Sequence, residues 1–326
     1  MILAGDIGGT HARVGLFENQ EGRPVLVAQR SYRSRDFPSL DAVLRKVLEE
    51  KPPRITAAAF GIAGPVQDGV VQTPNLPWEI DARSLAAVLG LARVQLLNDL
   101  EALAYGVHLL GAGDVVALNQ GEEATGNRAV VAAGTGLGVA GLLWDGTHHR
   151  PFATEAGHGD FAPRTPLEAE LMLHLTRRFG RVSGERVLSG AGLVNIYEFL
   201  RDTGHGEEPA WLRDRLASDD PAKVISVAGL DGSSPTCSQA LDLFASIYGA
   251  VAGNVGLVFL ATGGVYLGGG IAPKVLARLQ DPALFRAAFV DKGRLRPLLE
   301  QMPVRVVLDD GVGLKGAARV AVMEPR

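Results

Sequence analysis

Short apolar runs alternate with amphipathic stretches along most of this chain. Three apolar segments separated by tight turns predict an antiparallel meander, with strands over Met1–Asp6, Ala12–Glu18 and Pro24–Ser31. The next stretch repeats apolar residues at helical spacing and predicts an amphipathic helix over Pro38–Glu50. Strands and helices then alternate. Strands are expected over Ile55–Gly61 and Val94–Leu97, and helices are expected from a cap at Asp81 to about Leu89 and from about Asp99 onward.

The second half begins in the same way and then becomes mostly helical. Strands are expected over Val115–Leu118, Arg128–Ala133 and Gly138–Trp144, helices between Leu167 and about Ala261, strands over Gly264–Leu267 and Val304–Leu308, and a helix over Gly313–Val322. The order of elements therefore recurs, each time with a glycine-rich turn after an early strand. This predicts two similar α/β lobes that face each other across a cleft.

One long uncharged segment, from Leu243 to Pro273, has two interpretations. A membrane helix with a dimerisation face would use the GxxxG pair of Gly249 and Gly253. The segment also holds polar residues such as Asn254 and breaks at Thr262-Gly263-Gly264. We therefore expect a buried helix followed by a buried strand, and no membrane.

Composition narrows the class of protein. A chain of 326 residues with 47% apolar and 21% charged residues is typical of a folded protein with two domains. Its net charge of −4, without a basic block, argues against a nucleic acid partner. The single Cys237 excludes an internal disulfide and a multi-cysteine zinc site, and the N-terminus resembles a first strand rather than a signal peptide. We expect a cytoplasmic protein.

The first glycine-rich turn, Gly5-Asp6-Ile7-Gly8-Gly9-Thr10, lies between two expected strands and is not a Walker A loop. Glycines allow backbone N–H groups to surround a phosphate, and Thr10 adds a hydroxyl donor. Asp6 is positioned to hold a hydrated Mg²⁺. The alternative is an ordinary tight hairpin, but the combination of Asp6 and Thr10 favours phosphate binding.

Two further glycine-rich turns follow in the second half. Gly134-Thr135-Gly136-Leu137-Gly138 extends to a GxGxxG pattern with Gly141, but a strand rather than a helix is expected next, so a second phosphate hairpin fits better than a dinucleotide motif. Gly268-Gly269-Gly270 joins a strand to a helix expected near Pro273. This run suits the close approach of adenine, or a turn that packing alone requires.

Acidic residues supply the candidate chemistry. Asn98-Asp99 closes one expected strand and opens a helix, where ligands of α/β sheets bind, and spacing alone leaves Asp99 either a base or a helix cap. Glu155 and His158, three residues apart around a glycine turn, suit a polar clamp on a polyol better than a metal site. Glu185 has no signal of its own.

Taken together, the motifs resemble the bacterial glucokinase family of the sugar kinase/actin/Hsp70-like superfamily. The matching segments run in family order over essentially the whole chain: GDIGGTHAR at 5–13, GIAGPV at 61–66, NDLEA at 98–102, GTGLGVA at 134–140, ATEAGHGDFAP at 153–163, LSGAGLVNIY at 188–197 and YLGGGIAPK at 266–274. No single segment is decisive, but the ordered set is specific.

The resemblance implies an α/β, two-lobed actin-like (ribonuclease H-like) ATPase fold with a central cleft. It implies a small lobe over residues 1–110, completed by a C-terminal helix at about 311–326, and a large lobe over 111–310. It further implies glucose and ATP as substrates, Mg²⁺, and a homodimer. The family's base corresponds to Asp99, its sugar ligands to Asn98, Glu155, His158 and Glu185, and its phosphate loops to Gly5 through Thr10 and to Gly134-Thr135.

Two departures and three alternatives accompany the resemblance. His11 stands where the family usually has Asn, and Ala156 replaces a usual glycine. The related ROK-type kinases carry a cysteine-rich zinc motif, which a chain with one cysteine cannot have. The alternatives are a kinase for another hexose or amino sugar, a non-catalytic sugar-sensing regulator, and an actin-like filament ATPase. A regulator would need a DNA-binding segment and no Asp99, and a filament ATPase has no use for Glu155 and His158.

Overall fold

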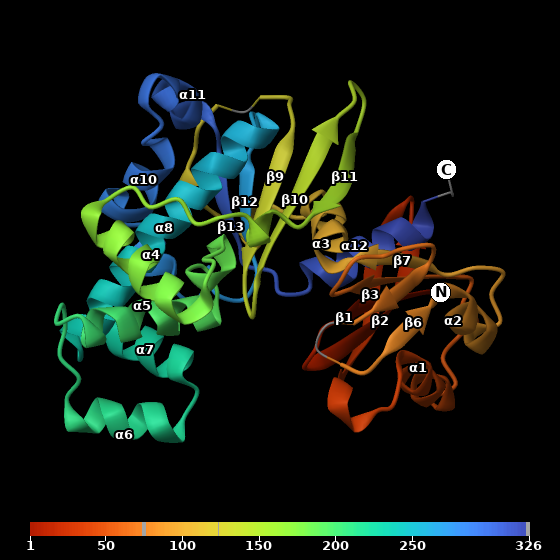
Figure 1. Cartoon of the computed structure of the whole chain (residues 1–326). Coiled ribbons are helices and arrows are strands. Elements are labelled where there is room, and N and C mark those ends of the chain that lie inside the picture. The colour runs from red at the N-terminus through yellow and green to blue at the C-terminus, as the bar shows by residue number, and fades with distance from the viewer. Residues whose placement is uncertain (74–75, 123, 324–326) are drawn as a thin grey trace. The chain divides into compact units, whose positions relative to one another are not determined.

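The computed structural model describes residues 1–73, 76–122 and 124–323, and the chain divides into two compact units. Unit 1 comprises Met1–Asp114, Pro151–Ala153 and Asp309–Arg326, and unit 2 comprises Val115–Arg150 and Thr154–Leu308. The last three residues of the C-terminal helix expected at 311–326 lie outside the described residues. Each unit is built around its own sheet (Figure 1).

Unit 1 contains a five-stranded sheet in the order β3-β2-β1-β4-β7. The strands are β1 (Ile2–Ile7), β2 (His11–Gln20), β3 (Arg23–Arg33), β4 (Ala57–Ile62) and β7 (Gln95–Asn98). The first three form the predicted antiparallel meander, whereas β4 and β7 run parallel to β1. The remaining elements are α1 (Leu40–Glu49), α2 (Ala82–Leu89), α3 (Asp99–Val107), α12 (Val312–Val322), the small hairpin β5 (Val70–Gln72) and β6 (Glu79–Asp81), and the short helices η1 (Ser34–Asp36) and η2 (Ala112–Asp114).

Strand β1 is apolar at every position except Asp6 because both faces of its sheet are covered. Leu3 and Ile7 belong to the core that contains the apolar faces of α1 and α2. Ile2 and Ala4 point to the opposite core, which is formed with α3 and α12. Local sequence sets the starts of the covering helices, since Ser39 caps α1 and Asp81 caps α2 through their side-chain oxygens, the latter as predicted.

Unit 2 contains a six-stranded sheet in the order β11-β10-β9-β12-β13-β8, although the middle residues of the edge strand β11, Pro151–Ala153, are grouped with unit 1. Its strands are β8 (Val115–Asn119), β9 (Arg128–Ala133), β10 (Leu137–Trp144), β11 (His149–Thr154), β12 (Val265–Gly268) and β13 (Val304–Val307). Sequence patterns did not predict β11, because an exposed edge strand that contains Pro151 lacks the apolar alternation of a covered strand. The helix expected near Pro273 begins only at Leu276, since residues 271–275 form turns.

Helices form most of the remainder of unit 2. They are α4 (Pro166–Phe179), α5 (Gly190–Asp202), α6 (Ala210–Ser218), α7 (Pro221–Leu230), α8 (Pro235–Phe259), α9 (Leu276–Leu279), α10 (Ala287–Val290) and α11 (Arg296–Gln301), with the short helices η3 (Ala156–His158), η4 (Gly184–Arg186), η5 (Pro282–Arg286) and η6 (Gly293–Leu295). Figure 1 shows α8 lying along the sheet, with α5 and α7 beyond it. The Tyr248 hydroxyl of α8 donates to the Val131 carbonyl of β9 at 3.0 Å.

Helix α8 is the apolar segment with two interpretations. Within the described residues it is the one helix long and apolar enough to cross a membrane, and 67% of its most apolar window is buried inside the protein. Both glycines of the GxxxG pair pack against another segment of this chain. A Cβ at Gly249 would collide with the Phe285 carbonyl, and a Cβ at Gly253 would collide with the Phe289 carbonyl. The small residues therefore admit the η5–α10 segment, as expected for a buried helix that precedes the buried strand β12.

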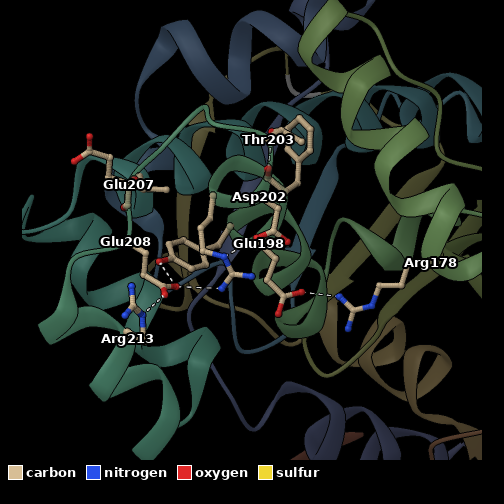
Figure 2. A network of polar contacts seen from close by, with 11 residues as sticks. Arg178, Glu198, Asp202, Thr203, Glu207, Glu208 and Arg213 are labelled. Atoms are coloured by element: carbon tan, nitrogen blue, oxygen red, sulfur yellow. Dashed lines mark hydrogen bonds and ion pairs between the residues drawn. The ribbon is translucent and has the colours of Figure 1, made fainter.

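A polar network anchors the connection between α5 and α6. Glu208, whose side chain is 10% exposed, accepts hydrogen bonds from Tyr197 Oη at 3.0 Å, Arg201 Nη1 at 3.1 Å and Arg213 Nε at 3.1 Å (Figure 2). Burial alone would raise the pKa of Glu208, but the hydrogen bonds from Arg201, Arg213 and Tyr197 outweigh it and hold the pKa below its usual range. The ionised carboxylate therefore ties the loop to both helices.

Candidate active site

The parallel strands of unit 1 place two predicted motifs at one edge of the sheet. Ile7 at the end of β1 pairs with Ile62 of β4, and Ile62 pairs with Asn98 of β7. The residues that follow these three strands are the Gly8–Thr10 turn, the 63–66 loop and Asp99. Carboxyl ends of parallel strands are where α/β sheets hold ligands.

The first glycine turn is fixed by its backbone and by a residue that the sequence did not indicate. The Gly8 N–H donates to the His11 carbonyl at 3.0 Å. Ser34, which is fully buried, donates from Oγ to the Gly8 carbonyl at 2.9 Å and from its N–H to the Thr10 carbonyl at 3.0 Å. Thr10 itself is exposed. Gly5 is required by packing instead, because a Cβ there would overlap the Phe60 ring.

Asp6 lies on β1 opposite Arg13 of β2 and close to the start of α12. A Cβ on Gly313 of that helix would be 3.7 Å from Asp6 Cγ, so the carboxylate lies near the helix N-terminus, which favours negative charge. Burial raises the pKa of the Asp6 carboxyl, the Arg13 guanidinium opposes the rise, and the Asp310 carboxylate adds to it. Arg13 Nη1 also donates to the Asp310 carbonyl at 2.8 Å.

Asn98, the residue before Asp99, fills the N-cap position of helix α3. Asn98 accepts from the Leu100 N–H at 2.9 Å, while its Nδ2 donates to the Gly64 carbonyl at 3.1 Å. Asp99 is the first helical residue, and its Oδ1 also accepts from the Leu100 N–H at 2.9 Å. Asn98 is 9% exposed, so the cap belongs to a largely buried amide. The half-buried Asp99 is therefore not needed as the N-cap.

The second glycine turn is a hairpin between two antiparallel strands. Residues on β9 and β10 pair from Ala133 and Leu137 outward, which is the predicted hairpin and not the strand-to-helix junction of a dinucleotide motif. The Gly134 N–H donates to the Gly136 carbonyl, and the Gly134 carbonyl accepts from the Gly190 N–H at the start of α5, both at 2.9 Å. Thr135 lies exposed at the tip.

The third glycine turn lies against the base of this hairpin. The Ile271 N–H donates to the Ala133 carbonyl at 3.2 Å, and a Cβ on Gly269 would overlap the same carbonyl. Gly269 also has a φ of 80°, which glycine adopts without strain. Packing therefore suffices to explain Gly269, which was one of the two interpretations of this run.

Glu155 is the N-cap of the short helix η3 and His158 is its last residue, and both side chains are exposed. The His158 N–H donates to the Glu155 carbonyl at 3.0 Å, and the His158 carbonyl accepts from Arg181 Nη1 at 2.8 Å. Gly157 between them packs on the Leu137 carbonyl so closely that a Cβ would overlap it. The turn is thus fixed against β10, and its exposed side chains belong to one rigid loop.

Only the tertiary structure brings Glu185 next to the second glycine hairpin. It lies on η4, where its Oε2 accepts from the Leu137 N–H at 3.0 Å. The η4 backbone is held by two buried side chains, since Ser189 Oγ of the α5 N-cap donates to the Glu185 carbonyl and Asn195 Nδ2 of α5 donates to the Arg186 carbonyl, both at 2.8 Å. Unit 2 therefore brings Gly134-Thr135, Glu155, His158 and Glu185 around one hairpin. Unit 1 holds Gly5 through Thr10, Asn98 and Asp99.

Metal-binding capacity is limited in the described part of the chain. Over residues 1–73, 76–122 and 124–323, no group of three or more His, Cys, Asp or Glu side chains is arranged to hold a metal ion. A metal there would take few protein ligands, as Mg²⁺ commonly does when it keeps its water and contacts phosphates.

Comparisons with known proteins identify the family to which the chain belongs. The family model described as Glucokinase matches residues 3–324. A glucokinase from Synechocystis sp. is 40% identical, with 97% of this chain and 96% of that protein covered. The crystal structure of a glucokinase from an Antarctic psychrotroph has a TM-score of 0.86 at 30% identity, covering 98% of each chain.

A more distant neighbour has the same fold. The ROK family glucokinase from Streptomyces griseus, solved in complex with glucose and AMPPNP, has a TM-score of 0.64 at 24% identity over 98% of each chain. The fold is therefore that of the actin-like sugar kinases, as the sequence predicted. Within that class, the match over nearly the whole length is specific, and the chain belongs to the glucokinase family.

Proposed function

We propose that this protein is a glucokinase that transfers the γ-phosphoryl group of ATP to the 6-hydroxyl of glucose, the first step of glycolysis. The observation that carries the proposal is the full-length similarity to glucokinases, at 40% identity to the Synechocystis sp. protein. The site described above supports it, since both units present a glycine hairpin and a carboxylate at a strand end.

Asp99 is proposed as the catalytic base. It follows β7 at the same sheet edge as the Gly8–Thr10 turn, and the N-cap position of α3 is filled by Asn98. In this role the carboxylate accepts the proton of the sugar hydroxyl as the oxygen bonds to the γ-phosphorus and ADP leaves. Phosphoryl transfer depends mainly on positioning and charge neutralisation, to which the base adds about 10²–10⁴-fold.

The remaining predicted residues are assigned to the two substrates. Asn98, Glu155, His158 and Glu185 are proposed to bind the sugar, since amide, carboxylate and imidazole groups suit vicinal hydroxyls. The N–H groups of the Gly5–Thr10 turn and the Gly134-Thr135 hairpin are proposed to bind the ATP phosphates. Asn98 retains one N–H and one lone pair beyond its bonds to Gly64 and Leu100, so a sugar contact remains open to it.

Mg²⁺ is proposed to bind near Asp6 through water. The fit is good because Asp6 presents a half-buried carboxylate, an oxygen donor of the kind Mg²⁺ prefers, next to a glycine turn and a helix N-terminus. When bound, the ion would neutralise phosphate charge. We further propose that units 1 and 2 correspond to the small and large lobes, and that the enzyme is a cytoplasmic homodimer.

A sugar panel in a coupled ADP-release assay tests the proposal. Glucose is expected to give ADP release that depends on ATP, with mannose and N-acetylated amino sugars turned over at much lower kcat/KM. A site built for a hydroxyl in a given position can reject a sugar that does not present it there, such as the C2 epimer mannose, by up to about 10⁴-fold, because the polar groups of the site are left unpaired. If another hexose is turned over faster, that hexose rather than glucose is the substrate. Absence of ADP release with every sugar would contradict the proposal that the protein is a sugar kinase.

A further inference from the structure

Leu137, the residue after the tip of the second hairpin, is held on three sides by parts of unit 2 that are distant in sequence. Its N–H donates to Glu185 Oε2 at 3.0 Å. Its carbonyl lies against Gly157, in the turn between Glu155 and His158. Its Cδ2 would be 3.3 Å from a Cβ on Gly184. The hairpin therefore cannot shift without moving both segments that carry the proposed sugar ligands.

Gly136, the residue before Leu137, also lies against the Glu185 carboxylate. A Cβ at Gly136 would be 2.5 Å from Glu185 Oε2 and 3.4 Å from its Cδ. The glycine is therefore the residue that lets the carboxylate reach the Leu137 N–H. Gly134, two residues earlier in the same hairpin, has open space at the corresponding position, and neither glycine has a φ in the left-handed region.

We propose that Glu185 is a positioning residue for the 134–138 hairpin as well as a sugar ligand, so that sugar binding and nucleotide binding are coupled through the Glu185–Leu137 hydrogen bond. The coupling rests on the proposed function. One carboxylate oxygen, Oε2, fixes the hairpin, while Oε1 remains to accept from a sugar hydroxyl. A sugar that immobilises this carboxylate also immobilises the hairpin that is proposed to hold the phosphates.

Coupling of this kind is reciprocal. If the sugar raises the affinity for nucleotide through Glu185, the nucleotide raises the affinity for sugar by the same factor. A change in the hairpin must then alter sugar binding even when no nucleotide is present, provided that it displaces Glu185. A change that leaves Glu185 in place must not.

Isothermal titration of glucose without nucleotide tests this with a matched pair of variants. Gly136→Ala adds a methyl group that displaces the Glu185 carboxylate, and we expect the Kd for glucose to rise about tenfold or more because a hydrogen bond from a sugar hydroxyl to this charged group is lost. Gly113→Ala in η2, which has no proposed role in the site, adds the same methyl group into open space, and its Kd for glucose should stay within about twofold of the wild type. Equal values for Gly136→Ala and wild type, or equal losses in the two variants, would overturn the coupling.

A second pair of variants tests the positioning role without sugar and without the Gly136 substitution. ADP with Mg²⁺ is titrated against Glu185→Ala and Glu185→Gln. The amide oxygen of Gln can still accept from the Leu137 N–H, so Glu185→Gln should bind ADP nearly as the wild type does, whereas Glu185→Ala should bind several-fold more weakly. Equal affinity in the two variants would overturn the positioning role. Should wild type bind no glucose while this difference persists, the proposed sugar kinase fails and the positioning role stands.

Discussion

At the scale of single residues, two of the carboxylates proposed for the site, Asp99 and Glu185, depend on different neighbours. Asp99 is not the N-cap of α3, because Asn98, the residue before it, occupies that position. Glu185 is placed by a hydrogen bond to a residue 48 positions away. The relation between Asn98 and Asp99 is local, and the adjacent Asn and Asp in the sequence already indicated both residues as candidates. The second is long-range and has no sequence signal.

Asp99→Asn is expected to lower kcat about 10²–10⁴-fold while glucose still binds, because the amide can hold the hydroxyl but cannot accept its proton. Steady-state assays for kcat, with titration of glucose for Kd, separate the two effects. Asp81→Asn is a matched control, since Asp81 caps α2 through its side chain and has no proposed role in the site. Turnover of Asp99→Asn close to that of the wild type would rule out Asp99 as the base.

At the scale of elements, periodicity predicted most helices and strands because each depends on residues a few positions apart. It missed the edge strand β11 and placed one helix too early, near Pro273, where turns precede Leu276. Two elements also depend on contacts that the pattern does not reveal. The α5–α6 connection depends on Glu208, and α8 depends on two glycines that admit the η5–α10 backbone.

Glu208→Gln is expected to lower the free energy of unfolding by about 1–3 kcal/mol at pH 7, because hydrogen bonds to a largely buried charge are lost. The pKa of Glu208 is lowered in the folded state, so its contribution is fully present above the unfolded glutamate pKa of about 4.3. The contribution is lost as the pH falls through the folded value. Denaturation curves between pH 3 and 7 should show the difference between variant and wild type shrinking below about pH 4.

The control for this experiment is the adjacent Glu207→Gln. Figure 2 shows the Glu207 side chain pointing away from the network around Glu208, and the residue is exposed. An exposed substitution of this kind usually changes stability by less than about 0.5 kcal/mol. Similar losses in Glu207→Gln and Glu208→Gln, or a difference that does not change with pH, would contradict the role given to the Glu208 carboxylate.

Gly249→Ala is expected to destabilise the protein by about 1–3 kcal/mol, because the added methyl group meets the Phe285 carbonyl, which belongs to the backbone and cannot rotate away. Gly256→Ala in the same helix provides the comparison. A Cβ there would be 3.2 Å from Met302 Sδ, a flexible side-chain atom, and the gain in helix propensity offsets part of the strain. Thermal denaturation of both variants should rank Gly249→Ala clearly lower, and the reverse order would refute this account of the GxxxG pair.

At the scale of the whole molecule, the two units have separate sheets and separate cores, while the family match spans both. Ligands that bind the folded protein only must raise its apparent stability by mass action. At a concentration 100 times the Kd, the gain is about 2.7 kcal/mol.

Glucose at 100 times its Kd is therefore expected to raise the Tm by several degrees. ATP with Mg²⁺, added without glucose, is also expected to raise the Tm. Mannose and N-acetylated amino sugars at the same concentration should shift the Tm less. Scanning the same panel with Glu155→Ala provides the control, because loss of a proposed sugar ligand should remove the glucose shift and leave the ATP shift. A Tm unmoved by glucose in the wild type would speak against glucose as the substrate.

The amino-acid sequence by itself determined most of the elements, the cap of α2, the hairpin nature of the first two glycine-rich turns and the family. These depend on periodicity, on residues within one helical turn such as Asp81 and Arg83, and on an ordered set of motifs. Only the tertiary structure decided what lies around the hairpins: Ser34 on the Gly8 and Thr10 carbonyls, Gly157 on Leu137, and Glu185 beside Gly136. The physical reason is sequence separation, because such contacts form only when packed elements bring distant residues into hydrogen-bonding or van der Waals range.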